Sequence, residues 1–358
     1  MSQKSLDKPA KILGILGGGQ LGRMSAMAAA RLGIKTHIFC PEKESPASHV
    51  AAKTFEAAYD DKQALKEFAK SVDVISYEFE NIPVETVRYL KKFKPVYPDE
   101  TLLEIAQHRW KEKQFLNDIG IPTAQWGKAK SADDIQRVLD QWGATSCIIK
   151  TTRFGYDGKG QAKINSLDDI TSAWKSLKTD EAIIESLVQF RYEISVIVAR
   201  DLFGKVQSYV PVLNDHKNHI LAKTTAPAPL DDSLLKRATQ MAEKLAKRVG
   251  LVGVLGLELF VTKDGQIIAN EIAPRTHNSG HWTIDACSVS QFENHVRCVC
   301  GLPVGKAVHH SDAVMINLIG DDIALVEKHQ SKANANIHLY GKPDVRAGRK
   351  MGHITILK

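Results

Sequence analysis

The sequence has few cysteines, no long hydrophobic run and no block of like charges. Its five cysteines are an odd number and include no Cys-x-x-Cys pair, which argues against a disulfide framework and a cysteine-ligated zinc site. No stretch of about 18 apolar residues occurs, so we expect no membrane-spanning helix and no membrane partner. The polar N-terminus and the short apolar stretch after it are wrong for a signal peptide. These absences predict a cytoplasmic protein with reduced thiols.

Positive charge is in moderate excess and is spread along the chain. The 358 residues include 48 lysines and arginines against 41 acidic residues, a formal net charge of +7. Because basic and acidic residues are interleaved, the pattern favours a pocket for phosphorylated small molecules, with a nucleic-acid surface as a minor alternative. The length allows two or three structural units and is typical of an enzyme.

The pattern of apolar residues changes twice along the chain. Over residues 1–102, short apolar runs alternate with helical patterns, which is typical of βαβ units around a parallel sheet. Residues 103–305 begin with two helical segments and then become rich in strands, and we expect residues 206–212 to form one of these strands. Residues 306–358 carry further short strands. We therefore predict an α/β unit, a larger α+β unit and a small β-rich unit.

A glycine cluster, Gly17-Gly18-Gly19-Gln20-Leu21-Gly22, follows the first expected strand and opens a helix. It matches Gly-x-Gly-x-x-Gly. The second strand, however, ends in His37-Ile38-Phe39-Cys40-Pro41 and lacks the acidic residue that holds a ribose in a dinucleotide fold, which argues against NAD. The backbone amides of such a turn either bind an anion such as a substrate phosphate or only pack the helix on the strand.

Acidic residues follow a later buried strand, in the segment Tyr77-Glu78-Phe79-Glu80-Asn81. Open α/β sheets bind ligands at the carboxyl ends of their strands, so Glu78 is a candidate acceptor of hydrogen bonds from a substrate. The alternative is an ordinary solvated loop acid.

A basic, glycine-rich loop follows an apolar strand that ends in Lys150. Residues 151–160 contain three glycines and two basic residues, which suits a flexible flap over a polyphosphate. No Ser or Thr follows Gly-Lys, so the loop is not a Walker A motif. The alternative is an ordinary hairpin that turns at Asp157-Gly158.

The segment 256–271 predicts a β-hairpin with a two-residue turn at Asp264-Gly265. If Lys263 pairs with Gln266, then Glu258 lies directly opposite Glu271. Like charges in this arrangement are destabilising, and burying them without a cation costs several kcal/mol. Because Mg²⁺ prefers a few carboxylates together with phosphate oxygens, we predict a magnesium site for a nucleoside triphosphate. A salt bridge to a lysine or arginine is the alternative.

Polar residues come directly after this hairpin. Arg275 offers a planar fork for an anion, and His277 titrates near neutrality, so the two residues suit binding and proton transfer at a small oxyanion. Near the end of the chain, Lys342 and the turn Gly348-Arg349-Lys350 add positive charge that either closes over the same anion or is solvated surface.

Together these residues resemble one family. The motifs GGGQLGRM, YEFENI, FGYDGKGQ, GLELFV, NEIAPRTHNSGHW and GRKMGH occur in that family's order and spacing. From residue 11 onward the chain resembles the ATP-grasp enzymes, and among them the 5-(carboxyamino)imidazole ribonucleotide synthases of purine biosynthesis. The resemblance implies a pre-ATP-grasp parallel-sheet domain (1–102), a two-part ATP-grasp core (103–305, with a lid near 125–188) and a small C-terminal β-rich domain (306–358).

The resemblance also implies a reaction and its participants. ATP phosphorylates bicarbonate to carboxyphosphate, which delivers CO₂ to the exocyclic amine of 5-aminoimidazole ribonucleotide, and ADP and phosphate leave. ATP and Mg²⁺ are the implied cofactors, the small-molecule substrates are the implied partners, and the family is usually a homodimer.

By motif, the resemblance assigns roles to individual residues. The residues that would hold ATP are Arg109, Lys150, Gly155, Tyr156, Asp157, Gly158, Lys159, Gly160, Gln161, Glu185, Ser186, Leu187, Val188, Glu193, His216, Asn270 and Glu271. The metal ligands would be Glu258 and Glu271. The residues that would meet the imidazole ribonucleotide or the carboxyphosphate are Gln20, Leu21, Glu78, Tyr156, Asp157, Asn278, Lys342, Arg349 and Lys350. The catalytic residues would be Arg275, His277 and Lys350.

One departure and three rivals accompany the resemblance. Many ATP-grasp enzymes have Glu-x-Asn at the second metal carboxylate, whereas this chain has Glu271-Ile272-Ala273, so the third protein ligand is not implied. The enzyme rival is the formate-dependent glycinamide ribonucleotide transformylase, against which Tyr156-Asp157 and residues 275–278 argue. An ATP-binding pseudoenzyme and a dehydrogenase are the other two rivals, and the intact phosphoryl-transfer residues argue against the pseudoenzyme.

Overall fold

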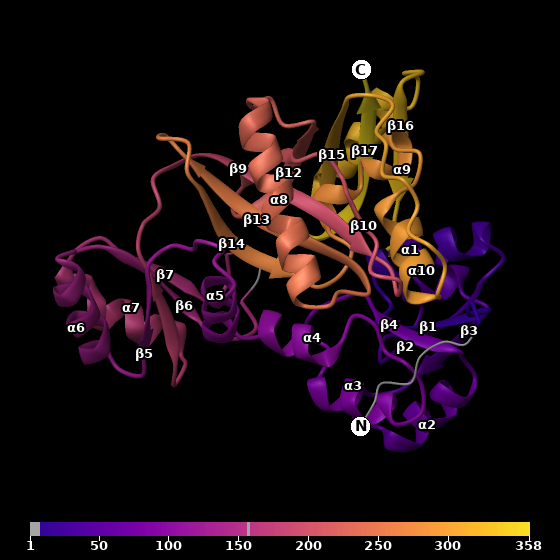
Figure 1. Ribbon diagram of the computed structural model, residues 1–358, viewed down its shortest axis with the longest axis horizontal. Helices are drawn as coiled ribbons and strands as arrows, with labels where there is room; N and C mark the ends of the chain where they lie inside the picture. Colours follow the sequence, from indigo (N-terminus) through magenta and orange to yellow (C-terminus); the bar gives the residue numbers. More distant parts are fainter. Residues whose placement is uncertain (1–7, 156–157) are drawn as a thin grey trace.

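A four-stranded parallel sheet forms the N-terminal domain in the computed structural model, which describes residues 8–155 and 158–358 (Figure 1). Its order is β3-β2-β1-β4, and its strands are β1 (Ile12–Leu16), β2 (Lys35–Cys40), β3 (Lys53–Glu56) and β4 (Val74–Tyr77). The helices of this domain are α1 (Gln20–Arg31), α2 (Lys62–Lys70) and α3 (Val84–Lys91). All four residues of β4 are buried, as in a parallel sheet that is covered on both faces. The alternating apolar runs predicted this arrangement correctly.

Two helices, α4 (Glu100–Ala106) and α5 (Arg109–Asp118), lead from this domain to a smaller lobe at the left of Figure 1. The lobe is an antiparallel sheet in the order β5-β8-β6-β7, which we call the lid sheet. Its elements are β5 (Trp126–Ala129), α6 (Ala132–Trp142), β6 (Cys147–Thr151), β7 (Gln161–Ile164), α7 (Ile170–Leu177) and β8 (Ala182–Glu185). The hydrophobic cluster of this lobe contains only residues between 129 and 184.

A nine-stranded sheet contains the remaining strands of the described chain, in the order β14-β13-β9-β11-β12-β15-β17-β16, with β10 paired to β9. Its strands are β9 (Phe190–Arg200), β10 (Val206–Ser208), β11 (Val212–Lys217), β12 (Ile220–Ala226), β13 (Gly253–Thr262), β14 (Ile267–Ala273), β15 (Ala313–Ile319), β16 (Ala335–Leu339) and β17 (Lys350–Leu357). The accompanying helices are α8 (Asp232–Arg248), α9 (Thr283–Ala286), α10 (Gln291–Val299) and α11 (Leu325–His329). Because β12 pairs with β15, the C-terminal strands continue the large sheet.

One hydrophobic cluster joins the N-terminal domain to the large sheet. It contains residues of β1 and α1 together with Phe292 and Val296 of α10 and Tyr340. The Ala10 amide also donates to the Cys300 carbonyl at 2.8 Å. These contacts hold the N-terminal domain against α10 and the large sheet.

The structure corrects one expected strand and bears out the thiol prediction. Residues 206–212 do not form one strand, since β10 ends at Ser208 and β11 begins at Val212. Pro211, which has no N–H to donate to a ladder, lies in the break. All five cysteines are free and buried.

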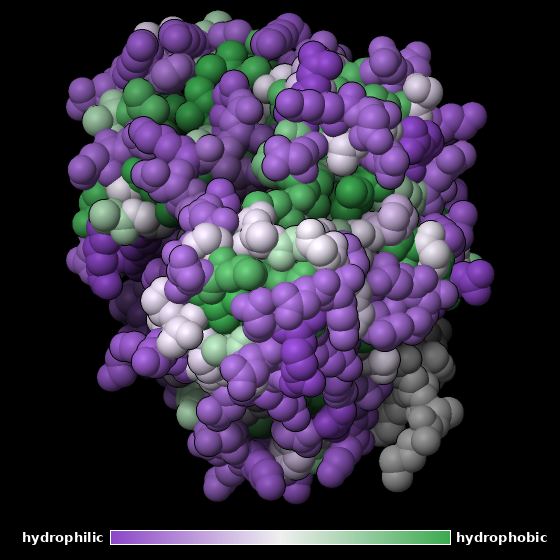
Figure 2. Space-filling view, turned by 90° about the vertical axis from the view of Figure 1, so that its left-hand side faces the viewer, coloured by the Kyte–Doolittle hydropathy of each residue, from purple (hydrophilic) through white to green (hydrophobic). Residues whose placement is uncertain are grey.

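The surface and the helices fit the composition. On the face that carries the lid sheet, hydrophilic side chains dominate and hydrophobic ones gather in several separate patches (Figure 2). In residues 8–155 and 158–358, no helix has the length and apolar character needed to span a bilayer.

Candidate active site

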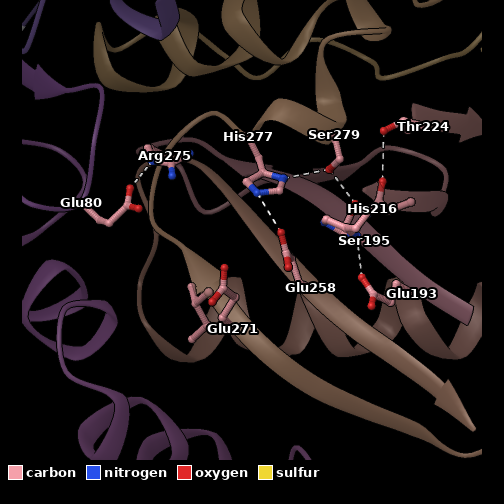
Figure 3. A network of polar contacts seen from close by, with 12 residues as sticks. Glu80, Glu193, Ser195, His216, Thr224, Glu258, Glu271, Arg275, His277 and Ser279 are labelled. Carbon is pink, nitrogen blue, oxygen red and sulfur yellow. Dashed lines mark hydrogen bonds and ion pairs between the residues drawn. The ribbon is translucent and has the colours of Figure 1, made fainter. Parts of the chain in front are cut away.

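Two glutamates lie side by side on the hairpin of β13 and β14 (Figure 3). The ladder pairs Glu258 with Glu271, as the sequence predicted. Burial and the negative charge of Glu258 raise the pKa of Glu271. Burial also opposes ionisation of Glu258, but the hydrogen bond and charge of His277 outweigh it and lower the pKa of Glu258. The two carboxylates therefore repel each other.

The turn of this hairpin differs from the prediction. The Thr262 amide bonds to the Gln266 carbonyl at 3.0 Å, so the loop has three residues and Lys263 does not pair with Gln266. Gly265 adopts a φ of 77°, as the last residue of such a loop requires. A bulge at Asn270 then shifts the register by one residue, and the two deviations cancel at the glutamate pair.

Each glutamate has a nitrogen-bearing neighbour. His277 Nε2 lies 3.0 Å from Glu258 Oε1, and Arg109 Nη1 lies 3.6 Å from Glu271 Oε2. The salt-bridge alternative is thus present, but the long Arg109 contact leaves the repulsion only partly compensated. The pair fits Mg²⁺ because its donors are carboxylate oxygens and the Glu271 side chain is 42% exposed, which leaves room for phosphate oxygens.

The turn after β14 brings a second set of polar groups to the glutamates. Arg275 Nε donates to the Glu80 carboxylate, which comes from the loop after β4 (Figure 3). Although burial opposes it, the Arg275 guanidinium lowers the pKa of Glu80 to about 2. The N-terminal domain is therefore tied to the hairpin by an ion pair that the sequence did not predict.

His277 is held on both sides of its ring. Its Nε2 contacts Glu258, and its Nδ1 lies 2.8 Å from Ser279 Oγ, which in turn is 2.6 Å from Ser195 Oγ on β9 (Figure 3). Beside it, both amide atoms of Asn278 are buried and have no hydrogen-bond partner among the described residues. An amide in this state is suited to a ligand with both donors and acceptors.

A cavity of about 290 Å³ lies between the lid sheet and the hairpin. The predicted residues that line it are Lys150, Glu185, Ser186, Leu187, Val188 and Asn270. Phe190 and Phe260 stack at its wall, with ring centroids 4.5 Å apart and planes 16° from parallel. The cavity thus combines an aromatic wall with charged groups.

Three charged side chains form a buried cluster in this cavity. Glu185 forms an ion pair with Lys150 and lies 3.1 Å from Nζ of Lys113. Lys113 is 1% exposed and also donates to the Asn270 carbonyl at 2.7 Å. Burial raises the pKa of Glu185, but the two lysines outweigh it and hold the pKa well below its ordinary value. Glu185 therefore stays ionised at neutral pH.

The glycine-rich loop joins β6 to β7, next to Arg109. Arg109 Nη2 donates to the Gly155 carbonyl at 3.4 Å. A Cβ on Gly158 would lie 2.7 Å from His219, and Gly158 and Gly160 both have positive φ. Lys159 and Gln161, which begins β7, complete the described part of this loop. Tyr156 and Asp157 lie outside the described residues.

Glu193 and His216 bind each other on neighbouring strands. His216 Nδ1 lies 2.6 Å from Glu193 Oε2 (Figure 3). Burial opposes protonation of His216, but Glu193, with smaller contributions from Glu258 and Glu271, raises its pKa. These two predicted ATP residues therefore lie beside the glutamate pair and do not line the 290 Å³ cavity.

Glu78 fills the glycine turn. Its carboxylate accepts hydrogen bonds from the amides of Gly19 and Gly22, the latter at 2.7 Å. A Cβ on Gly17 or Gly19 would lie within 2.6 Å of Glu78 atoms, so these glycines make room for the side chain. Glu78 therefore occupies two of the amides that the glycine turn would offer to an anion. The solvated-acid alternative is wrong, since Glu78 is 9% exposed.

The basic residues near the C-terminus approach the same turn. The charge of Lys342 acts on Glu78, and burial, followed by the charge of Arg349, lowers the pKa of Lys342 to about 8. Arg349 donates to the Asp344 carbonyl at 3.0 Å, and Lys350 begins β17. Gln20 begins α1 and the neighbouring Leu21 is buried, so both predicted residues lie on the first turn of that helix. The predicted substrate residues thus come from both ends of the chain.

Comparison with known proteins agrees with this architecture. Family models match at residues 10–107 (ribonucleotide synthetase preATP-grasp domain), 114–292 (ATP-grasp domain) and 313–358 (phosphoribosylaminoimidazole carboxylase C-terminal domain). N5-carboxyaminoimidazole ribonucleotide synthase from Brucella melitensis is 50% identical, over 100% of this chain and 99% of the relative. The Bacillus subtilis synthase is 39% identical, over 99% and 93%. The chain belongs to the N5-carboxyaminoimidazole ribonucleotide synthase family.

Solved structures of N5-carboxyaminoimidazole ribonucleotide synthases have the same fold. The ADP complex of one such synthetase superposes with a TM-score of 0.94 at 39% identity, covering 100% of this chain and 94% of the other. The Aspergillus clavatus enzyme in complex with ADP and 5-aminoimidazole ribonucleotide superposes with a TM-score of 0.90 at 31% identity, covering 98% and 94%.

Several residues of this synthase site were missed by sequence reasoning. Lys113 lies on a helix among other charged residues, and nothing in its spacing distinguishes it from a solvated lysine. Phe190 and Phe260 read as ordinary strand residues. Glu80 could have been found, because it belongs to the acidic segment after β4, but its partner Arg275 is 195 residues away.

Proposed function

We propose that this chain catalyses the ATP-dependent carboxylation of 5-aminoimidazole ribonucleotide by bicarbonate, which gives N5-carboxyaminoimidazole ribonucleotide, ADP and phosphate. Membership of the synthase family supports this function. The structural observation that carries it is the position of the Glu258–Glu271 pair. Asn270, next to Glu271, lines the cavity, whereas Glu258 contacts His277 of the second polar group. A phosphoryl group at the pair would therefore have the cavity on one side and the Arg275–Asn278 turn on the other.

ATP would occupy the cavity. Its adenine would lie against the aromatic wall and residues 185–188, where backbone groups after β8 offer hydrogen bonds. Lys150 and Arg109 would bring positive charge to the phosphates, with the Gly155–Gln161 loop above them. Mg²⁺, held by Glu258 and Glu271, supplies neutralisation of the charge on the transferred phosphoryl group.

Phosphoryl transfer joins two anions. A bicarbonate oxygen attacks the γ-phosphorus of ATP, the bond from that phosphorus to ADP breaks, and carboxyphosphate forms. Arg275 supports this step because its guanidinium is a fixed, always charged fork for an oxyanion. Glu80 holds that fork in place through Nε, and the Thr276 carbonyl accepts from Nη1 at 2.9 Å, so Nη2 is the nitrogen that would face the substrate. Asn278 supplies the unpartnered amide beside it.

Carboxyphosphate then breaks its carbon–oxygen bond and releases phosphate and CO₂. The exocyclic amine nitrogen of the imidazole ribonucleotide attacks the CO₂ carbon and loses a proton. His277, oriented by Glu258 and Ser279, is the group we assign to proton transfer in this step. The Gly155–Gln161 loop would exclude water, which otherwise hydrolyses the mixed anhydride.

The imidazole ribonucleotide would bind between the glycine turn and the C-terminal strands. Glu78 would accept hydrogen bonds from its hydroxyl or amine groups. Lys342, Arg349 and Lys350 would meet its phosphate, and Gln20 and Leu21 would border it. The mutual approach of Glu78 and Lys342 supports this location.

The experiment is ADP release from ATP, Mg²⁺ and bicarbonate, measured with and without 5-aminoimidazole ribonucleotide. We expect stimulation by the imidazole substrate and formation of the carboxylated product. A parallel reaction with glycinamide ribonucleotide and formate is the control. Stimulation only in that reaction would move the function to the transformylase, and no turnover in either would support a pseudoenzyme.

A cytoplasmic location and a homodimer belong to the same proposal. The five buried free thiols support a reducing compartment. The homodimer rests on the family resemblance. Light scattering on the purified protein tests the dimer, since a single mass near the 39.5 kDa of one chain would contradict it.

A further inference from the structure

A cluster of metal-ligating side chains lies away from the Glu258–Glu271 pair. Asp285, His338 and His353 each place one ligand atom so that all three atoms lie within 4.8 Å of one another. We propose that these three residues form a second metal site, which takes a divalent transition-metal ion such as Zn²⁺. This inference does not depend on the reaction proposed above.

The fold fixes the positions of all three residues. His338 on β16 lies directly opposite His353 on β17 in the antiparallel ladder, and their rings stack with centroids 4.4 Å apart. Asp285 lies on α9, which packs against β17. His338 Nε2 is 2.9 Å from Asp285 Oδ2 and 3.1 Å from Oδ1. The site therefore rests on a strand pair and a helix and involves no mobile loop.

His353 is prepared for ligation. The residue is fully buried, and its Nε2 has no hydrogen-bond partner among the described residues. Its Nδ1 lies 2.9 Å from the Tyr340 hydroxyl, and in the tautomer whose Nδ1 donates to that hydroxyl, Nε2 presents a lone pair to a metal ion. Metal-binding histidines show this pattern, with an outer partner on the second nitrogen. Leaving a buried nitrogen without a partner is destabilising, and a bound cation would remove that penalty.

The protonation of the side chains in the cluster is compatible with a bound cation. His353 is 0% exposed, and such burial disfavours a charged imidazolium, whereas a metal ligand must be a neutral ring. The proton between His338 and Asp285 occupies the place that a metal ion would take. The other groups facing the cluster are the buried His281, whose ring centroid is 5.0 Å from that of His353, and Tyr340.

The donor set selects the metal. Two imidazole nitrogens and one carboxylate are typical of Zn²⁺ and similar ions, whereas Mg²⁺ prefers oxygen ligands only. Ligand atoms around a tetrahedral zinc ion are about 3.4 Å apart. On binding, the 2.9 Å pair of His338 and Asp285 must therefore open by about 0.5 Å, and the atoms that lie up to 4.8 Å apart must close by up to about 1.4 Å. His338 and Asp285 are 23% and 11% exposed, which leaves them free to adjust and admits the ion together with a water as fourth ligand.

Such an ion would fasten the C-terminal strands to the core. It would link β16 and β17 to α9, which follows the Arg275–Asn278 turn. Lys350, a proposed substrate residue, begins β17. The inferred role is therefore structural, since the metal would hold the C-terminal strands beside the substrate site.

The test is calorimetric titration of the full-length, chelator-treated protein with ZnCl₂, in the presence of Mg²⁺ and ADP to occupy the first site. We expect one zinc ion per chain. Removing a group that hydrogen-bonds a metal ligand already weakens metal binding by roughly 10–100-fold. H338Q and D285N remove a ligand itself, so each should weaken zinc binding by at least about tenfold. H310Q, which changes an exposed histidine outside the cluster, is the matched control. E271Q should also retain zinc binding, because Glu271 belongs to the proposed magnesium site and not to this cluster.

Two outcomes would overturn the proposal: no zinc bound by the unmodified protein, or zinc binding that survives both H338Q and D285N, whether or not E271Q loses it. A second probe does not depend on the variants folding. Co²⁺ bound to the unmodified protein should show the intense visible absorption of a four-coordinate site. A spectrum of hydrated Co²⁺ would contradict the site.

Discussion

Replacing Glu271 with glutamine should abolish phosphoryl transfer without destabilising the metal-free protein. The substitution removes one of two opposed carboxylates, whose repulsion across a strand pair is worth roughly 0.2–1 kcal/mol. It also removes the 3.6 Å contact with Arg109, a loss of about the same size. The net change in the free energy of unfolding should therefore lie within about 0.5 kcal/mol of zero, a shift in Tm of about 2 °C or less.

Activity should respond very differently. With one carboxylate left, the charge on the transferred phosphoryl group is poorly neutralised, and kcat should fall by at least about 100-fold. ADP release measures activity, and thermal unfolding in EDTA measures stability. The control is E67Q, which removes an equal charge from the exposed face of α2. Unchanged turnover would refute the two-carboxylate metal site, and destabilisation beyond about 1 kcal/mol would show that the Arg109 contact outweighs the repulsion.

The pH dependence of stability gives a further check on this pair. Because the pKa of Glu271 is raised above its ordinary value of 4.5, the folded protein keeps this proton to higher pH than the unfolded chain does. Its contribution is fully present below 4.5 and is lost as the pH rises through the raised value. The glutamine variant lacks this titration, so its relative stability should increase with pH. If the free energy of unfolding of E271Q instead falls relative to that of the unmodified protein above pH 5, the pKa of Glu271 is not raised.

Three further predictions concern nucleotide and substrate binding. K113M removes the lysine that holds Glu185 and Asn270 at the cavity wall. If these groups bind ATP, displacing them costs one charged hydrogen bond to the nucleotide, worth about 1.5–3 kcal/mol, and the KM for ATP should rise by about 10–100-fold. K111M, on the exposed face of the same helix, should leave this KM unchanged, and equal effects of the two variants in steady-state kinetics would remove Lys113 from the site. G19A places a Cβ 2.6 Å from Glu78 Oε1 and should lower kcat/KM for the imidazole ribonucleotide by about tenfold or more, with the KM for ATP unchanged. With its pKa at about 8, Lys342 is charged below that pH and neutral above it, so the KM for the imidazole ribonucleotide should rise above pH 8. K342R keeps its charge and should remove this rise. A rise that persists in K342R would show that another group causes it.

The sequence predicted those parts of the fold that depend on local pattern. The alternation of apolar runs identified β1, α1, β2, α2, β4 and α3. The opposition of Glu258 and Glu271 was also predicted correctly, although the turn was not. A three-residue loop and a bulge each shift the register by one, and neither has a signal beyond Gly265 and Asn270 themselves.

Other features depend on contacts between distant parts of the chain. Glu78 was a candidate for substrate binding, but its role as the acceptor in the glycine turn depends on β1 and β4 being neighbours in the sheet. Lys113 becomes a site residue only because α5 packs between β8 and β14. His338 and His353 are separated by 15 positions with no motif between them, and only the strand pairing brings their rings together.

The lid sheet has only a hydrophobic cluster of its own among the described residues, whereas the N-terminal domain, besides its own cluster, shares one with α10 and Tyr340. In hydrogen-exchange experiments the amides of β6 and β8 should therefore open as one unit, ahead of those of β9 and β13. A nucleotide in the cavity would contact both the lid sheet and the hairpin. Opening the lid sheet would then break these contacts, so the free energy of opening should increase by the free energy of nucleotide binding. Resistance of this lobe to limited proteolysis then becomes a direct measure of nucleotide occupancy, one that needs neither substrate nor turnover.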